Sequence, residues 1–153
     1  MAIELIDRKS NENKYLHRDF HLILNRAIQH IGTVYGEEGV QEYIKRYAHK
    51  YFGAMTMTEI KSYLTEVYQR EEADDLIQIS LNHDTLSIKI SMCPAIRYIK
   101  EKGDIPCEYY KHTVSTLYMT IAEISNLKFN LDYYEQDNGA ASFSFSRNKK
   151  VNI

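Results

Sequence analysis

The first half of the chain carries apolar residues at intervals of three and four, the spacing of an amphipathic helix. Three helices are expected, at residues 14–31, 37–52 and 58–70. Gly32 and Gly53 follow the first two segments, and we expect each glycine to end its helix. Thr56 or Thr58 is suited to cap the third, because a threonine hydroxyl can accept a hydrogen bond from a free backbone N–H group. Residues 1–13 are expected to form a loose lead-in.

From residue 76 the period of the apolar positions changes to two, which indicates half-buried strands. The alternation covers residues 76–91 and 127–147, and each segment has a turn signal near its middle. In the third strand we expect Leu127, Phe129, Leu131 and Tyr133 to share one face. One apolar and one polar face are typical of an antiparallel sheet that rests on a core.

The order of helices and strands predicts an α+β fold. We expect both hairpins in one four-stranded antiparallel sheet, with the helices packed on one face. The core is expected to contain Ile77, Ile79, Ile88, Val114, Leu117, Ile121, Phe129, Leu131 and Phe143. A length of 153 residues predicts a single domain, and residues 147–153 are expected to form a mobile tail.

Between the hairpins the pattern is helical again. Pro94 opens one helix and Gly103 stops it, which is the usual asymmetry of helix ends. A second helix is predicted to start at residues 104–106. Its apolar positions recur on one face, and they are Cys107, Tyr110, Val114, Leu117, Ile121 and Ile124. Cys107 and Tyr110 are therefore expected to point inward.

Cys93 falls at the junction between a strand and the Pro94 helix, where free backbone N–H groups and the positive end of the helix dipole meet. Such a position lowers the pKa of a thiol and can produce a nucleophilic thiolate. A small buried cysteine that fills space is the alternative interpretation. If the first interpretation holds, Cys93 should react with an alkylating reagent faster than Cys107.

Composition restricts the classes of function. A net charge of −2 gives no reason to expect a nucleic-acid partner, and no apolar run approaches membrane-spanning length. The first ten residues lack the pattern of a signal peptide, so we expect a cytoplasmic protein with reduced thiols. Thirteen tyrosines and no tryptophan stand out, because tyrosine lines pockets well.

Several side chains are candidates for chemistry near Cys93. Arg97 can hold a substrate carboxylate, and Tyr110 can help to close a pocket. Cys107 is a second inward-facing thiol, and His112 is the nearest candidate base, although five residues after Cys107 it points away from that face. His17 and His21 have a spacing that can hold a metal, but no further ligands surround them.

No metal site is therefore predicted, and the absence of a phosphate-binding loop predicts no nucleotide cofactor. The acidic run at residues 71–75 is expected to be a solvated helix end.

The stretch from Cys93 to Gly103, followed by residues 108–113, resembles the L-2-amino-thiazoline-4-carboxylic acid hydrolase-like family. Members of that family are similar in having a Cys-Pro helix, a glycine break, a Tyr-Cys-x-x-Thr-like helix and a C-terminal hairpin. The resemblance is strongest over residues 92–123. Lys111 stands where the second cysteine is expected, and Cys107, about one helical turn earlier, is its possible replacement.

The resemblance implies ring opening of a thiazoline carboxylate by hydrolysis of a cyclic C–N bond. Cys93 would be the catalytic nucleophile, with Cys107 and His112 as further catalytic residues and Arg97 and Tyr110 as substrate-binding residues. The alternative is a non-enzymatic module that binds a small molecule in a tyrosine-lined pocket. A homodimer that packs through the serine-rich sheet face is a third hypothesis.

Overall fold

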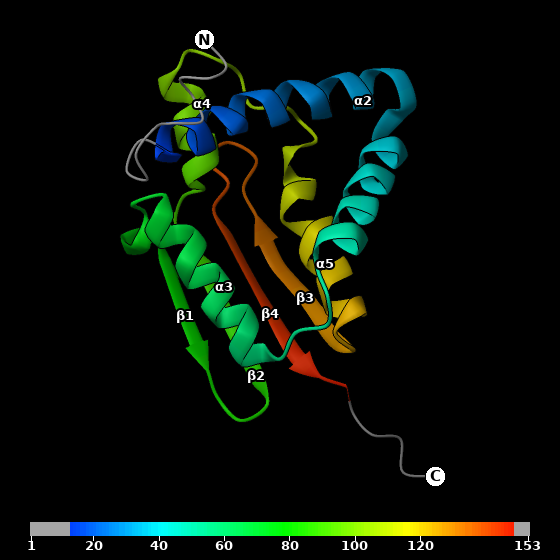
Figure 1. Cartoon of the computed structure of the whole chain (residues 1–153), viewed down its shortest axis with the longest axis vertical. Coiled ribbons are helices and arrows are strands. Elements are labelled where there is room, and N and C mark those ends of the chain that lie inside the picture. Colours follow the sequence, from blue (N-terminus) through cyan, green and yellow to red (C-terminus); the bar gives the residue numbers. More distant parts are fainter. Residues whose placement is uncertain (1–12, 149–153) are drawn as a thin grey trace.

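Residues 13–148, which the computed structural model describes, form helices on one face of a four-stranded antiparallel sheet (Figure 1). The elements are α2 (Asn13–Tyr51), α3 (Met57–Arg70), η1 (Asp74–Leu76), β1 (Ile77–Leu81), β2 (Thr85–Ile90), α4 (Pro94–Glu101), η2 (Tyr110–Thr113), α5 (Ser115–Ile124), β3 (Leu127–Tyr134) and β4 (Ala141–Arg147). Helices α3 and α5 contact the sheet, and α2 contacts α4 and α5. The predicted α+β class is confirmed, while most of the expected lead-in and tail lies outside the described residues.

The two hairpins join in one sheet with strand order β1-β2-β4-β3. At its centre Ile88 pairs with Ile79 on β1 and with Phe143 on β4, and Phe143 pairs in turn with Leu131 on β3. These four side chains share the face that the helices cover, as the period of two predicts.

A β-bulge in β3 changes which tyrosine faces the core. The register between β3 and β4 shifts between Leu131 and Tyr133, which leaves Asp132 as the extra residue. As a result Tyr133 is exposed, whereas Tyr134 is partly buried against the core. The expectation that Tyr133 shares the inner face was therefore wrong, because strict alternation does not survive an inserted residue.

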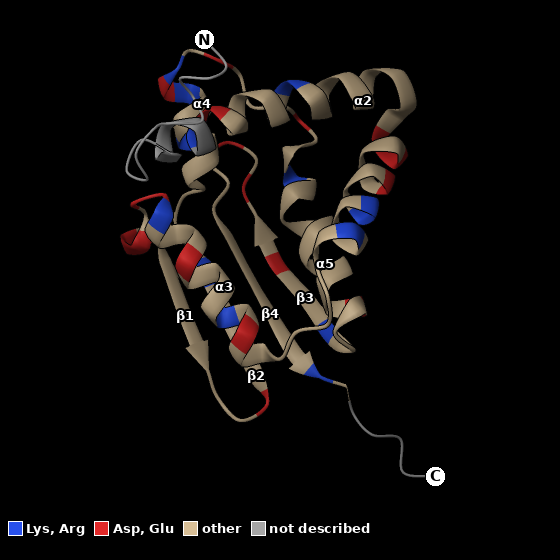
Figure 2. Cartoon of the chain, viewed as in Figure 1, with Lys and Arg blue, Asp and Glu red and all other residues tan. Residues whose placement is uncertain are grey.

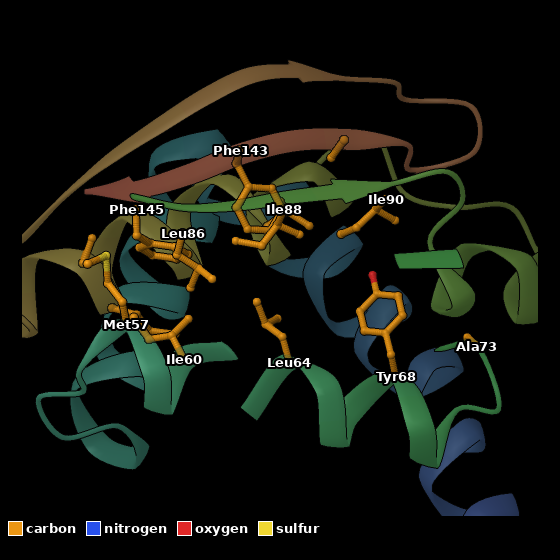
Figure 3. Packing of buried hydrophobic residues seen from close by; sticks show 14 residues of the cluster. Met57, Ile60, Leu64, Tyr68, Ala73, Leu86, Ile88, Ile90, Phe143 and Phe145 are labelled. Carbon is orange, nitrogen blue, oxygen red and sulfur yellow. The ribbon is translucent and has the colours of Figure 1, made fainter. Parts of the chain in front are cut away.

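The main core lies between the sheet and helices α3 and α5 (Figure 3). Of the predicted core residues, Ile88, Val114, Ile121 and Phe143 are buried. The other five are partly buried and pack against this cluster: Ile77, Ile79, Leu117, Phe129 and Leu131. A second cluster joins α2, α4 and the segment before α5, and it contains Cys107 and Tyr110 with Cys93 at its edge.

The first two predicted helices form one element, α2, which breaks at Gly36 rather than ending at Gly32. Gly36 has φ +75°, a conformation that suits glycine. Gly32 stays helical, and a Cβ atom built there would lie 2.3 Å from Cε2 of Tyr109. Gly32 therefore provides room for a packed ring. In the part of the chain that the structure describes, no helix is both long and apolar enough to cross a membrane.

The helix predicted from residue 104 begins instead at Ser115, after the short η2. Asn25 of α2 explains the difference. Its side chain is buried, donates from Nδ2 to the Ile105 carbonyl (2.8 Å) and accepts at Oδ1 from the Cys107 N–H (2.7 Å). These bonds hold the segment in a non-helical path, so Cys107 lies in a loop.

Candidate functional site

Cys93 is the N-cap of α4, as the sequence predicts. It has extended backbone angles (φ −74°, ψ 121°), and Pro94 follows in the first helical position. The Cys93 N–H donates to the Asn138 carbonyl of the β3–β4 turn (2.9 Å), and its carbonyl accepts from the Arg97 N–H (3.0 Å). The thiol makes no capping hydrogen bond. The backbone of Cys93 is thus fixed from both sides.

The electrostatics of Cys93 differ from the sequence expectation. Burial raises the pKa of the thiol, because a thiolate loses its hydration in the interior. The N–H groups of Ile96 and Ala95 at the start of α4 lower the pKa of the Cys93 thiol, whereas the Glu71 carboxylate raises it further. The net pKa is raised, so the expected lowering by the helix N-terminus does not prevail. Cys93 is therefore a neutral thiol near pH 7.

Four tyrosines from four different elements lie near enough to Cys93 for its charge to affect their pKa values. Tyr68 comes from α3, Tyr110 from η2, Tyr118 from α5 and Tyr134 from β3. In each case burial is the main cause of a raised pKa, and the proximity of Cys93 raises the pKa further. We call these five residues the Cys93–tyrosine cluster. At neutral pH all five are protonated and can donate hydrogen bonds.

No tyrosine hydroxyl of the cluster has a hydrogen-bond partner among the residues that the structure describes, and two of the four tyrosines are also buried. The side chains of Tyr68 and Tyr110 are 6% and 3% exposed, and neither hydroxyl forms a hydrogen bond with any residue that the structure describes. No fully enclosed side-chain oxygen or nitrogen in this part of the chain lacks a partner, so both hydroxyl oxygens retain some accessible surface. Figure 3 shows the Tyr68 hydroxyl pointing from α3 toward the sheet. Because buried hydroxyls are normally paired, these two indicate room for a polar ligand atom or a water.

A cleft of about 230 Å³ lies beside α4. Its lining residues are Arg18, Glu71, Glu72, Pro94, Arg97, Tyr98 and Glu101. Arg18 is engaged, because it donates to Glu72 Oε2 (3.1 Å) and to the Glu71 carbonyl (3.3 Å). Arg97 forms no side-chain hydrogen bond or ion pair with residues 18–148. Its guanidinium group is therefore the cation of this cleft that is available to a ligand carboxylate.

Glu71 connects the cleft with the cluster. It lines the cleft, and its charge raises the pKa of Cys93, Tyr68 and Tyr110. Glu71 is 4% exposed and lies 2.7 Å from His21 Nε2. The expectation that the acidic run is solvated was thus wrong for Glu71, because Arg18 and His21 of α2 contact this residue.

The other predicted catalytic residues lie elsewhere. Cys107 is buried, its Sγ accepts from the Tyr109 N–H (3.4 Å), and burial raises the pKa of its thiol. Both cysteines are free thiols. Cys107 belongs to the same packed cluster as Cys93 and Tyr110. This arrangement brings three of the five predicted site residues into one region of the core.

His112 is buried, although its helical position had suggested a side chain that points outward. Its Nδ1 lies 2.6 Å from Thr116 Oγ1, and its Nε2 lies 2.9 Å from Glu37 Oε1. Lys111 also pairs with Glu37, at 3.3 Å. Hydrogen bonds from His112 and Lys111 lower the pKa of the Glu37 carboxyl. His112 hydrogen-bonds neither cysteine, and its partners tie η2 and α5 to α2.

Sequence reasoning missed Tyr68, Tyr118, Tyr134 and Glu71. Tyr68 continues the inward positions Ile60 and Leu64 at intervals of four, so its burial was open to prediction. Tyr134 was not, because the bulge in β3 leaves no clear mark in the alternation. A metal site is not formed here: no group of three His, Cys, Asp or Glu side chains within residues 18–148 is arranged to hold an ion.

Comparison with known proteins does not place the chain in a family. No protein-family model matches it, and no curated protein shows a significant match.

Proposed function

We propose that this chain is a small-molecule-binding module whose ligand contacts the Cys93–tyrosine cluster and extends into the cleft beside α4. The observation that carries this proposal is the pair of buried, unpartnered hydroxyls on Tyr68 and Tyr110. Both hydroxyl oxygens retain some accessible surface, so a ligand atom can reach them. A ligand that accepts hydrogen bonds from both groups would gain about 0.5–1.5 kcal/mol from each.

The charges suggest the class of ligand. Arg97 is suited to a carboxylate, and the carboxylate of Glu101 is suited to an amidinium or ammonium group. The neutral donors of the cluster fit a ring that carries acceptor atoms, which the flat tyrosine faces can also contact. A small heterocyclic carboxylic acid with a basic nitrogen meets these requirements, and 2-aminothiazoline-4-carboxylate is one such compound.

The experiment measures protection of Cys93 against iodoacetamide, read by peptide mass spectrometry, with 2-aminothiazoline-4-carboxylate as the probe. We expect the probe to slow labelling of Cys93 and to leave Cys107 unchanged. Tyr68→Phe and Tyr110→Phe should each weaken protection about 2- to 10-fold, the effect of one neutral hydrogen bond. Arg97→Gln should weaken it more, whereas Arg46→Gln, on the far part of α2, serves as the matched control.

If millimolar probe gives neither protection of Cys93 nor heat in calorimetry, this ligand class is wrong. Protection that is equal in wild type and in the Tyr68→Phe, Tyr110→Phe and Arg97→Gln variants would contradict the proposed site.

A second candidate function is hydrolysis of a cyclic C–N bond by Cys93. It is favoured by the position of the thiol at the start of α4, where the Ala95 and Ile96 N–H groups lower its pKa against the effect of burial. In this reaction Sγ forms a bond to the carbon between the ring nitrogen and sulfur, and the thiol proton passes to the ring nitrogen. The bond between that carbon and the ring nitrogen then breaks, and the exocyclic amino group gives the departing nitrogen its second proton as it forms a C=N bond. Water adds to the same carbon, the bond to Sγ breaks, and a proton of the water returns to the thiol as the ring-opened product leaves.

Loss of the thiazoline ring, followed by liquid chromatography, tests this second function. Cys93→Ser should abolish turnover and leave the circular dichroism spectrum unchanged, because serine can still cap α4 but is a far poorer unassisted nucleophile. Probe binding without turnover in the wild type supports the binding module alone. Full turnover by Cys93→Ser would exclude catalysis by this thiol.

A further inference from the structure

The second half of α2, after the break at Gly36, exposes a row of aromatic side chains. Tyr43, Tyr47 and Tyr51 follow one another at intervals of four, with exposed fractions of 42%, 42% and 64%. The rings of Tyr47 and Tyr51 are in contact, with centroids 4.9 Å apart. Tyr35, at the break, is 72% exposed. Side chains four positions apart lie on the same side of a helix, so these rings form one continuous surface.

This row flanks the buried side of α2, which carries Val40, Ile44 and Ala48. At about 100° of rotation per residue the tyrosines lie beside that buried side rather than opposite it, and the Tyr47 ring contacts Phe52 at the edge of the main core. Figure 1 shows this half of α2 along the outer edge of the molecule. Large exposed apolar side chains that gather in one place commonly mark an interaction site. Tyrosine is enriched at such sites, because its ring is apolar and its hydroxyl is polar.

A row of charges runs along one edge of the tyrosines and suggests which partner fits. Glu42, Arg46 and Lys50 each precede a tyrosine by one position, and Glu38 continues their spacing of four, so the order along the helix is Glu38, Glu42, Arg46, Lys50. The first two are acidic and the last two are basic, as Figure 2 shows. The row spans about 18 Å at 1.5 Å per residue. When two copies of this row lie side by side in antiparallel orientation, each acidic residue of one copy faces a basic residue of the other.

We propose that two copies of this chain associate through the tyrosine row of α2, antiparallel and related by a two-fold axis near residue 44. In this arrangement Glu42 of one copy faces Arg46 of the other, and Glu38 faces Lys50. The contact is self-complementary, as a two-fold interface requires. Arg46 already pairs with Glu42 within its own helix at 3.1 Å, so association brings four alternating charges together.

Acidic residues at the start of a helix and basic residues at its end also stabilise a lone helix through its dipole. That effect explains the charge order, but it gives no reason for three exposed tyrosines beside the charges. The outer face of the sheet is a weaker candidate for self-association. It carries exposed Gln78, Ser80 and Lys89 and offers little apolar area to bury.

Sedimentation velocity over 5–500 µM, about a hundredfold range of concentration, tests the proposal. The wild type should change from monomer to dimer. Glu42→Lys and Arg46→Glu should each weaken association at least 10-fold, because each places like charges opposite one another. An equimolar mixture of the two variants should restore it, since every facing pair is then opposite in charge. Glu66→Lys is the matched control, because Glu66 forms a similar intrahelical pair with Arg70 on the exposed side of α3.

A wild type that remains monomeric up to 500 µM would overturn the proposal. A dimer that Glu42→Lys and Arg46→Glu leave intact would overturn it as well, by showing that another surface carries association. Protection of Cys93 by the probe is measured in the same variants. Because no residue of the row lines the cleft or belongs to the Cys93–tyrosine cluster, protection should persist when dimerisation is lost, which separates this proposal from the proposed function.

Discussion

Gly139 lies directly against Cys93. A Cβ atom built on Gly139 would stand 2.4 Å from Cβ of Cys93 and 2.8 Å from Cδ1 of Ile96. The neighbouring Asn138 carbonyl accepts the hydrogen bond from the Cys93 N–H. The β3–β4 turn therefore packs on the cap of α4 and holds the thiol between the last hairpin and the helix, which explains how two distant parts of the sequence form one site.

Gly139→Ala should destabilise the protein by more than 1 kcal/mol. Gly139 has φ +71°, where a residue with a Cβ atom is strained by about 1–2 kcal/mol, and the steric conflict with Cys93 adds to this. Urea unfolding measures the change. Gly53→Ala is the control, because Gly53 has open space around it and no positive φ. Equal stability of the two variants would contradict the close approach.

Alkylation of Cys93 should depend on pH in the way that burial dictates. Because the pKa of the folded thiol is raised, the thiolate fraction at pH 7 is below that of free cysteine, whose pKa is about 8.5. The rate should therefore keep rising above pH 8.5 in the folded protein. The same protein unfolded in urea should give the ordinary midpoint. A folded midpoint at or below 8.5 would show that the N–H groups of α4 prevail over burial.

Labelling should also be faster at Cys93 than at Cys107. Cys93 is partly exposed, whereas Cys107 is 5% exposed and its sulfur accepts a hydrogen bond from the Tyr109 N–H. Iodoacetamide reaction at pH 8, followed by peptide mass spectrometry, compares the two rates in one sample. Faster labelling of Cys107 would mean that the segment after α4 opens more readily than the cap.

Glu37→Gln should reduce stability at neutral pH and have less effect in acid. The pKa of Glu37 is lowered in the folded state by His112 and Lys111, so its ionised form stabilises the fold above the unfolded pKa of about 4.3. That contribution is lost as the pH falls through the lower, folded pKa. Urea unfolding between pH 3 and pH 7 should show the difference from wild type shrinking toward acid. Glu66→Gln, on the exposed side of α3, should show no such trend.

Ile121→Ala should destabilise the protein by about 2–5 kcal/mol, because Ile121 is 1% exposed and its removal leaves a cavity in the main core. Leu117→Ala should fall at the lower end of that range, since Leu117 is partly buried between the two clusters. Met119→Ala, at an exposed site on the same helix, should stay within about 0.5 kcal/mol. A Leu117→Ala variant with an unchanged unfolding midpoint would remove Leu117 from the core.

Features that depend on neighbours in the chain were open to prediction from the sequence. Hydrophobic period distinguishes strands from helices, so both hairpins and the α+β class followed from it. Pro94 and Gly103 act locally on backbone angles, which placed Cys93 at the cap of α4. The family resemblance suggested a ligand class, which remains a prediction.

Tertiary contacts decided the rest. The side chain of Asn25 overrides the helical pattern at Cys107 because it forms hydrogen bonds with the Ile105 carbonyl and the Cys107 N–H. One inserted residue in β3 turns Tyr134 inward, and its position depends on the pairing with β4.

The pKa of Cys93 likewise depends on tertiary contacts that local sequence does not reveal. The sequence places Cys93 beside the positive end of a helix dipole, which lowers a thiol pKa. Only the folded structure determines how much hydration the thiol loses beneath its neighbours, and this loss outweighs the helix. Local sequence therefore determined where the thiol lies, and long-range packing determined the direction in which its pKa shifts.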